Sequence, residues 1–185
     1  MAASISFYDS SVKPLKACVV STLNIIAKGK AWAEKTSTPE AELLSEARLA
    51  PDMLPLSFQF MMVIDIINGL VCHVRGTENP PLPSDKLVSF AVVEEAVRAA
   101  SAQLDSLTVD EVNAAATKEV TLKLGPVIRQ QVFIDGMVTG YTLPNAFFHI
   151  TTAYAILRSK GADLGKAEYV VPFLGPAIAA CASKK

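Results

Sequence analysis

Apolar residues recur at every third or fourth position in four long stretches of the chain. These stretches cover about residues 9–34, the segment from the end of "LAPDMLP" to about residue 75, roughly 84–107 and about 145–159. The spacing places the apolar side chains on one face of a helix and therefore predicts four long helices. Gly76 and Gly161 follow the second and fourth stretches, where a glycine commonly ends a helix.

Local signals add short helical segments to this pattern. Ser6 and Asp9 have the spacing of a capping box at the start of the first long helix. Thr38 is typical of the N-cap of a short helix over "PEAELLSEAR". Thr108 and Glu111 repeat the capping-box spacing after the third long helix and predict a short extra turn.

Residues 118–134 break the helical spacing. "KEVTLKL" alternates polar and apolar residues, and "GPVIRQQVFI" follows it after a Gly-Pro turn, which predicts a small β-hairpin. "TENPPLPSD" and "DGMVTGYTLP" are expected to be loops. The predicted fold class is therefore mainly all-α: a four-helix bundle with a small β-hairpin or irregular crossover before the last long helix.

The length of 185 residues predicts one domain, 1–185, with an apolar C-terminal tail over 169–185. A hydrophobic content of 51% is ample for a single core. The tail is interrupted by prolines and a glycine, and it is too short to span a membrane. Because it is also too apolar to remain in water, we expect it to dock on the body or on a partner subunit.

Composition and charge argue against several classes of partner. The 17 basic and 18 acidic residues give a net charge of −1 and form no basic stripe, so nucleic acid is not an expected partner. The most apolar stretch, 53–72, contains Pro55, Gln59, Asp65 and Asn68, which a membrane span disfavours. The first residues lack the apolar segment of a secretory signal, so we expect a cytoplasmic protein with no membrane partner.

The motifs of several common enzyme classes are absent from the sequence. It contains no G-x-x-x-x-G-K-[ST], G-x-G-x-x-G, G-x-S-x-G or H-E-x-x-H, so nucleotide binding, the hydrolase elbow and zincin chemistry have no support. The three cysteines are widely spaced and predict neither a disulfide framework nor a C-x-x-C site. Each of these absences is weak on its own, and together they narrow the candidate chemistry.

Asp65 is the first candidate catalytic residue, because its helix is apolar nearly all round and belongs in the middle of the bundle. Phe58 and Met62 share its stripe at 100° per residue, Gln59 lies on a neighbouring line, and these three are candidate ligand-binding residues. A buried carboxylate must be paired or have its pKa raised, and a general acid or base needs a raised pKa. Asp65 either transfers protons or fixes the register of the helices.

His149 is the second candidate catalytic residue and lies on the fourth long helix. It shares a stripe with Asn145 and Thr152, which are candidate ligand-binding residues. An imidazole paired with Asp65 would form a proton-transfer dyad, with Tyr154 as a further catalytic candidate. The alternative is a core histidine whose hydrogen bonds are satisfied.

Arg48 and His73 are two further polar residues of interest. Arg48 has both a ligand-binding and a structural interpretation, whereas His73 has only a structural one. Arg48, in "ARLAPDMLP", either binds an anionic ligand or pairs with an acid, and the sequence does not decide between them. His73 stands near the end of the second long helix, where its simplest role is to complement the helix dipole.

Three segments of the chain carry a family resemblance. "SFYDSSV", "EARLAPDMLPL" followed by Gln59 and Asp65, and "FFHITTAYAILRSKGADLGKAEYV" resemble the signatures of an uncharacterised bacterial and fungal family in the DinB-like superfamily. The resemblance implies a four-helix bundle of DinB type that is often dimeric. It also implies relatives that bind a divalent metal through three histidines and include thiol-dependent transferases.

The chain departs from that metal-binding pattern. His73 and His149 are its only histidines, and Ala153 stands one turn after His149, where a second ligand would be expected. A site made of Asp65 and His149 would have fewer ligands than transition metals usually take. We therefore expect no metal and no cofactor.

Two hypotheses for the function remain open. In the first, the protein is a metal-independent enzyme of isomerase or cyclase type that encloses a hydrophobic small molecule and uses Asp65, His149 and Tyr154 for proton transfer or polarisation. In the second, the cavity only binds a hydrophobic ligand, or side chains fill it and the protein is a dimerising structural module. A homodimer is expected, and a metal-dependent transferase or hydrolase is the least favoured alternative.

Overall fold

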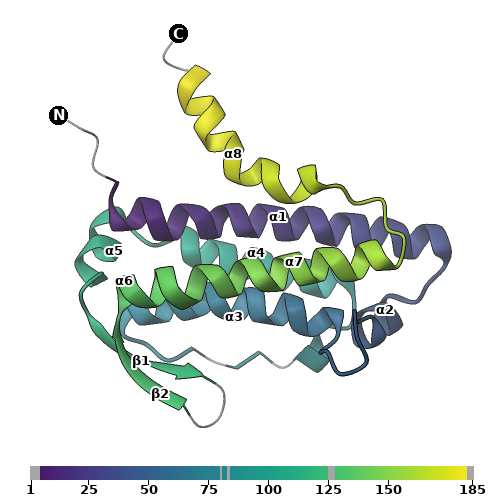
Figure 1. The fold of residues 1–185 in the computed structure, drawn as a ribbon, viewed down its shortest axis with the longest axis horizontal. Coiled ribbons are helices and arrows are strands. Elements are labelled where there is room, and N and C mark those ends of the chain that lie inside the picture. The colour runs from purple at the N-terminus through teal and green to yellow at the C-terminus, as the bar shows by residue number, and fades with distance from the viewer. Residues whose placement is uncertain (1–4, 80, 83, 125–127, 183–185) are drawn as a thin grey trace.

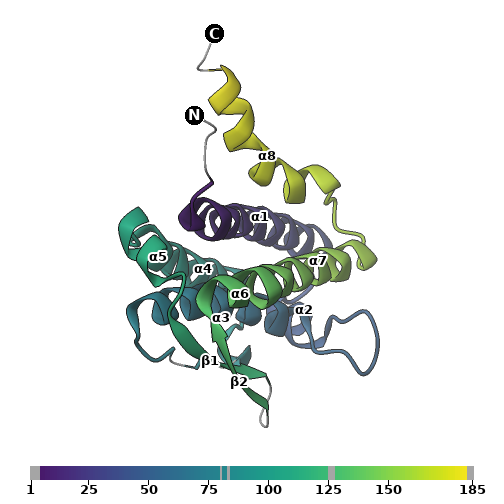
Figure 2. The same ribbon diagram turned by 60° about the vertical axis from the view of Figure 1, so that its left-hand side comes forward.

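The body of the molecule is a bundle of four long helices that lie side by side (Figures 1 and 2). The computed structural model of the chain describes residues 5–79, 81–82, 84–124 and 128–182. Helices α1 and α3 each pack against both α4 and α7, so α1 and α3 lie on one diagonal of the bundle. The predicted bundle is confirmed, with long helices α1 (Phe7–Thr36), α3 (Leu56–Arg75), α4 (Phe90–Asp105) and α7 (Leu143–Ser159).

Shorter elements connect the long helices and extend from them. The crossover from α4 to α7 carries an antiparallel hairpin, as predicted, in which Glu119 pairs with Phe133 and Leu124 with Ile128. The predicted Gly-Pro turn lies outside the described residues. The elements are α2 (Glu40–Glu46), η1 (Ser84–Lys86), α5 (Val109–Ala115), β1 (Glu119–Leu124), β2 (Ile128–Phe133), α6 (Ile134–Met137), η2 (Val138–Thr142) and α8 (Lys166–Ala182).

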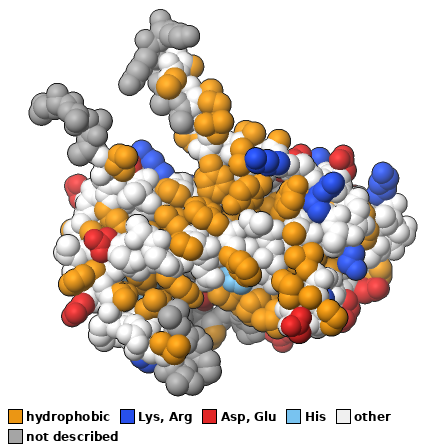
Figure 3. Space-filling view, in the orientation of Figure 1, with side chains coloured by type: hydrophobic (Ala, Val, Ile, Leu, Met, Phe, Trp, Pro, Cys, Tyr) orange, Lys and Arg blue, Asp and Glu red, His pale blue; other side chains and the backbone are white. Residues whose placement is uncertain are grey.

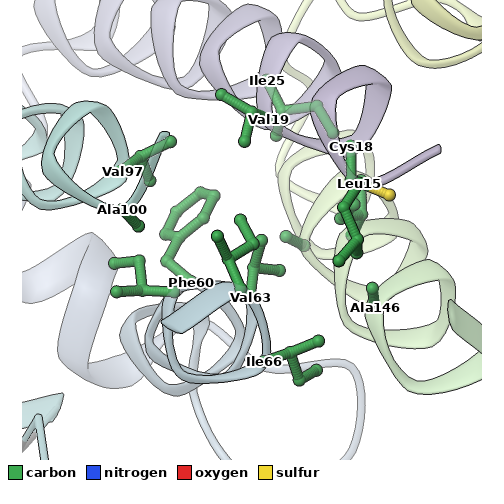
Figure 4. Close-up of a cluster of buried hydrophobic side chains, with 14 of the residues drawn as sticks. Leu15, Cys18, Val19, Ile25, Phe60, Val63, Ile66, Val97, Ala100 and Ala146 are labelled. Atoms are coloured by element: carbon green, nitrogen blue, oxygen red, sulfur yellow. The ribbon is translucent and has the colours of Figure 1, made fainter. Parts of the chain in front are cut away.

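The core fills the space between the four long helices. Phe60 and Val63 point from α3 into this space, where they meet Val97 of α4 and Val19 of α1 (Figure 4). Phe60 is fully buried and packs edge-on against the ring of Phe90. Among the described residues, α3 is the one helix long and apolar enough to cross a membrane, but it lies in the bundle as a core helix with much of its surface buried.

Two capping boxes form as predicted, and two helix starts differ from prediction. The Ser6–Asp9 and Thr108–Glu111 boxes open α1 and α5. Helix α4 begins at Phe90 rather than near residue 84, because the Ser89 hydroxyl accepts from the backbone of Val92 and fixes the start there. Helix α2 has Pro39 at its N-cap position with no side-chain cap, so the prediction that Thr38 caps it is wrong.

The segment "DGMVTGYTLP" is helical, and the prediction of a loop is wrong. Helix α6, the π-helical turn η2 and α7 follow one another without a break. Ile134 and Val138 are buried, so the segment keeps one apolar face toward the core. Pro144 lacks an N–H group and disrupts an α-helical ladder, but here it falls in the first turn of α7, directly after the wider π turn. The glycines and the proline therefore do not interrupt the helix.

Helix α8 begins against α1 and then leaves the bundle (Figures 1 and 2). The Asn24 side chain donates to the carbonyl of Glu168 at 3.1 Å, and the Ser21 hydroxyl donates to that of Tyr169 at 2.8 Å. Pro172 has no N–H to donate to the Glu168 carbonyl four residues earlier, and Asn24 supplies that hydrogen bond instead. The apolar tail is thus part of a helix that starts at residue 166 and docks on the body at its beginning.

Apolar surface surrounds the point where α8 meets the bundle. Figure 3 shows hydrophobic side chains gathered there and continuing onto the lower part of α8. The large apolar side chains of α8 that remain exposed include Val171, Leu174 and Ile178. Docking of the tail on the body therefore covers only part of its apolar surface.

Candidate functional site

An open cavity of about 500 Å³ lies beside α3, on the side that faces the hairpin and η2. Its walls come from three parts of the chain that are distant in sequence: α3 with the loop after it, strand β1, and the α6–η2 segment. The lining residues are Asp65, Ile66, Gly69, Leu70, His73, Thr77, Glu78, Asn79, Thr121, Leu122, Lys123, Met137, Tyr141 and Thr142.

Helix α3 presents one face to this cavity. Asp65, Gly69 and His73 are four residues apart, so they lie above one another on the same side of the helix. Gly69 leaves space because it has no side chain, and a Cβ atom there would lie 3.6 Å from the amide nitrogen of Asn79. The two polar groups of α3 are separated by eight residues, or about 12 Å along the helix axis.

Asp65 is held in place by Asn79 from the loop after α3. The Asn79 side-chain nitrogen donates to the Asp65 carboxylate at 2.9 Å and to the Asp65 backbone carbonyl at 3.1 Å. The Asn79 side-chain oxygen is buried and has no hydrogen-bond partner among the described residues. Burial raises the pKa of Asp65 above its usual value, and the hydrogen bond from Asn79 opposes that rise. Protonation of Asp65 is therefore easier than for a carboxylate in water.

Tyr141 adds a second titratable group near Asp65. Burial raises the pKa of its hydroxyl, and the negative charge of Asp65 raises it further. The Tyr141 hydroxyl therefore stays protonated at neutral pH and is available as a hydrogen-bond donor. Asp65 and Tyr141 form the acidic end of the cavity.

His73 and Lys123 line the cavity on the side of strand β1. Burial lowers the pKa of His73, and the positive charge of Lys123 lowers it further. His73 is therefore neutral at pH 7, and Lys123 carries the positive charge of this basic end. Glu78 adds an exposed carboxylate to the lining.

His149 lies in a different place and does not pair with Asp65, so the predicted dyad is wrong. Its Nδ1 lies 2.8 Å from the side-chain oxygen of Gln59, and the Gln59 nitrogen donates to the carbonyl of Leu54 at 3.0 Å. This arrangement places the imidazole proton on Nδ1. Burial lowers the pKa of His149 to about 4, so the ring is neutral at pH 7. The axial stagger of α3 and α7 brings His149 to Gln59 rather than to Asp65, six residues further along α3.

The remaining predicted site residues also lie outside the cavity lining. The Tyr154 hydroxyl donates to the carbonyl of Leu164 at 3.4 Å, and the Thr152 hydroxyl donates to that of Phe148. Arg48 forms an ion pair with Glu46 at 3.8 Å, which is the second of its two predicted roles.

The other candidates lie on the same two helices as Asp65 and His149. The ring of Phe58 packs edge-on against that of His149. Met62 and Asn145 are half-buried on α3 and α7. The structure therefore brings Asp65 to the cavity without the other residues predicted for its site.

The residues present do not fit the three-histidine metal centre of DinB-like relatives. Buried Ala153, one turn after His149 on α7, offers no ligand atom. His73 lies fourteen residues from Gln59 on α3, or roughly 21 Å along the axis, so the two histidines cannot share an ion. Across the described part of the chain, no three His, Cys, Asp or Glu side chains are grouped closely enough to hold a metal.

Asp65 is the one lining residue that was predicted as a site residue, and the polar residues missed include His73, Asn79, Lys123 and Tyr141. The spacing of Asp65, Gly69 and His73 is a signal for His73, because a glycine between two polar residues on one helix face leaves an open wall. Asn79 and Lys123 lie in a loop and a hairpin whose positions periodicity does not define. Tyr141 lies in the segment predicted as a loop.

Comparisons with known proteins agree with the bundle. A crystal structure of a DinB family member from Shewanella denitrificans is similar, with a TM-score of 0.76 and 26% sequence identity, over 88% of this chain and 90% of that chain. No curated protein matches the chain. The fold is therefore DinB-like. A family model described as Domain of unknown function (DUF1993) matches residues 7–170, and the chain belongs to that family.

Proposed function

We propose that this protein is a metal-independent enzyme that binds a small molecule in the cavity beside α3 and uses Asp65 to exchange a proton with it. The observation that carries the proposal is the position of Asp65, a half-buried carboxylate that lines the cavity and is held by a single side-chain amide. A general acid or base must reach the ligand and must be oriented, and Asp65 meets both conditions.

The neighbours of Asp65 support acid–base chemistry. Its raised pKa moves the carboxyl group toward the range in which it both accepts and returns a proton. Tyr141 retains its proton and is placed to donate a hydrogen bond to a carbonyl or similar oxygen of the ligand. Together the two groups would serve an isomerase-type or cyclase-type reaction, in which a proton is removed from one atom and returned to another.

The lining favours an amphipathic substrate over the purely hydrophobic one expected from the sequence. Ile66, Leu70, Leu122 and Met137 supply apolar contacts. The remaining lining side chains are mostly polar, and three of them are threonines. A substrate with an apolar middle and polar ends would match this distribution.

His149 is outside this proposed mechanism. Its Nδ1 proton is engaged by Gln59, and the ring is not part of the cavity lining. The hydrogen bonds from His149 to Gln59 and from Gln59 to Leu54 join α7 to the start of α3. We assign His149 the structural role, the alternative considered from the sequence.

Solvent exchange tests the proposal. Enolisable keto acids and amino ketones are incubated with the protein in D₂O, and loss of their α-proton signals is followed by ¹H NMR. Asp65→Asn keeps the shape of the side chain but removes the base, so it should slow exchange at least about 100-fold when the compound is present at saturating concentration. Asp105→Asn, which changes a carboxylate on α4 that pairs with Lys16, is the matched control and should have no effect.

The outcomes separate the two classes of function. Exchange at the wild-type rate in Asp65→Asn would contradict the assignment of Asp65. Binding without exchange in the wild-type protein would contradict the enzyme and favour a ligand-binding module. Gly69→Leu places a side chain in the cavity and should abolish both binding and exchange.

A further inference from the structure

The cavity beside α3 has two ends of opposite character. Asp65 marks one end and Lys123 the other, where Lys123 stands beside His73. Asp65 and His73 are eight residues apart on one face of α3, which separates the ends by about 12 Å. Apolar side chains from α3, β1 and α6 lie among the lining residues.

The acidic end is short of hydrogen-bond donors. One carboxylate oxygen of Asp65 accepts from Asn79, and the other has no partner among the described residues. The side-chain oxygen of Asn79 is also unsatisfied within the described part of the chain. An unpaired buried acceptor is unfavourable, so a ligand group that donates several hydrogen bonds gains most at this end. A primary ammonium group does so and also balances the charge of an ionised Asp65.

The basic end offers the exposed cation of Lys123 to an anionic group. Lys123 forms no ion pair with any described residue, and its ammonium group is available to a ligand. His73 is neutral, so it adds a hydrogen-bonding group beside Lys123 without adding a second positive charge. A carboxylate, or another anionic group of similar size, pairs with Lys123 there.

We propose that the cavity selects a dipolar small molecule, with an ammonium group at Asp65 and Asn79 and an anionic group at Lys123, joined by an apolar chain. This inference rests on the proposed function, because it names the substrate class of the same site. The exposed carboxylate of Glu78 stands in the loop next to Asn79 and adds to the preference for a cation at that end.

Three probes that differ only in their end groups test the proposal: 8-aminooctanoate, octanoate and octylamine. Their chains are comparable in length to the separation of the two ends. Binding is measured by calorimetry on the full chain at pH 7 and low ionic strength. We expect 8-aminooctanoate to bind at least tenfold more tightly than either singly charged probe.

Charge variants should divide the probes into two groups. Lys123→Gln should weaken 8-aminooctanoate and octanoate at least about tenfold and leave octylamine unchanged. Asp65→Asn should weaken 8-aminooctanoate and octylamine and leave octanoate unchanged. Lys86→Gln, on η1 and outside the lining, is the control and should change none of them.

The result that overturns the inference is an equal affinity for the three probes, an equal loss for all three in either variant, or no binding of 8-aminooctanoate. If the three probes bind equally well and Gly69→Leu abolishes their binding, the cavity is the binding site but does not select a dipolar molecule. The expected pattern of affinities together with no proton exchange would contradict the proposed enzyme and leave the ligand class intact.

Discussion

Acidification should destabilise this protein through His149, whose side chain is 8% exposed. Its pKa falls from 6.5, the ordinary value, to about 4 in the folded chain because burial penalises the charged ring. Between these two values the unfolded chain binds a proton that the folded chain does not. The stability from this group is therefore fully present above pH 6.5 and is lost as the pH falls toward 4.

The size of the effect follows from the same two values. At about 1.4 kcal/mol for each pH unit between them, the loss is about 2 kcal/mol at pH 5 and about 3 kcal/mol at pH 4. Protonation would also place a second N–H on the ring, and Gln59 engages only the first. A buried cation without a partner is the physical origin of the penalty.

Urea unfolding between pH 4 and 7 measures this loss when wild type is compared with His149→Gln. The glutamine does not titrate, so the difference in free energy of unfolding between the two proteins should shrink by about 2 kcal/mol from pH 7 to pH 5. Gly29→Ala is the control, because it changes stability without removing a titrating group, so its difference from the wild type should stay constant over this pH range. A difference that stays constant over this pH range would refute the reasoning.

Three further predictions concern single side chains. Gly29→Ala places a Cβ atom 2.8 Å from Phe90 Cζ, and the overpacking should lower the free energy of unfolding by about 1–3 kcal/mol in urea titrations. Thr108→Ala removes the capping box of α5 and should cost about 1 kcal/mol, measured in the same way; no change would argue against that cap. Asp65→Asn should remove a contribution opposite in sign to that of His149: because the pKa of Asp65 is raised, the stability of the wild type relative to this variant should fall as the pH rises through that pKa, measured by thermal melts from pH 4 to 8.

The helices were predictable where apolar spacing and capping residues agree. Helix α1 begins where the Ser6 and Asp9 side chains cap it, and α3 ends at Gly76, which adopts the left-handed conformation. The segment 135–144 was not predictable in the same way, because Gly136 and Pro144 are local signals for a loop. The buried face formed by Ile134 and Val138 outweighs them once tertiary packing is present.

The candidate site was predictable in its central residue only. Apolar spacing identifies Asp65 as a carboxylate inside the bundle, but its partner Asn79 lies in a loop without any repeating pattern. The choice between Asp65 and Gln59 as the partner of His149 depends on how far α7 is displaced along α3. The two positions differ by about 9 Å along the axis, and spacing within one helix contains no information on that displacement.

The π turn η2 determines which way the preceding helix faces. A π turn holds one residue more than an α turn, and each residue in a helix turns the chain by about 100°. Deleting one residue from 138–142 would rotate α6 relative to α7 and change the direction of Met137, which lines the cavity. The cavity is therefore sensitive to the length of this segment. An insertion or deletion of a single codon there would change its lining without altering the identity of any residue that lines it.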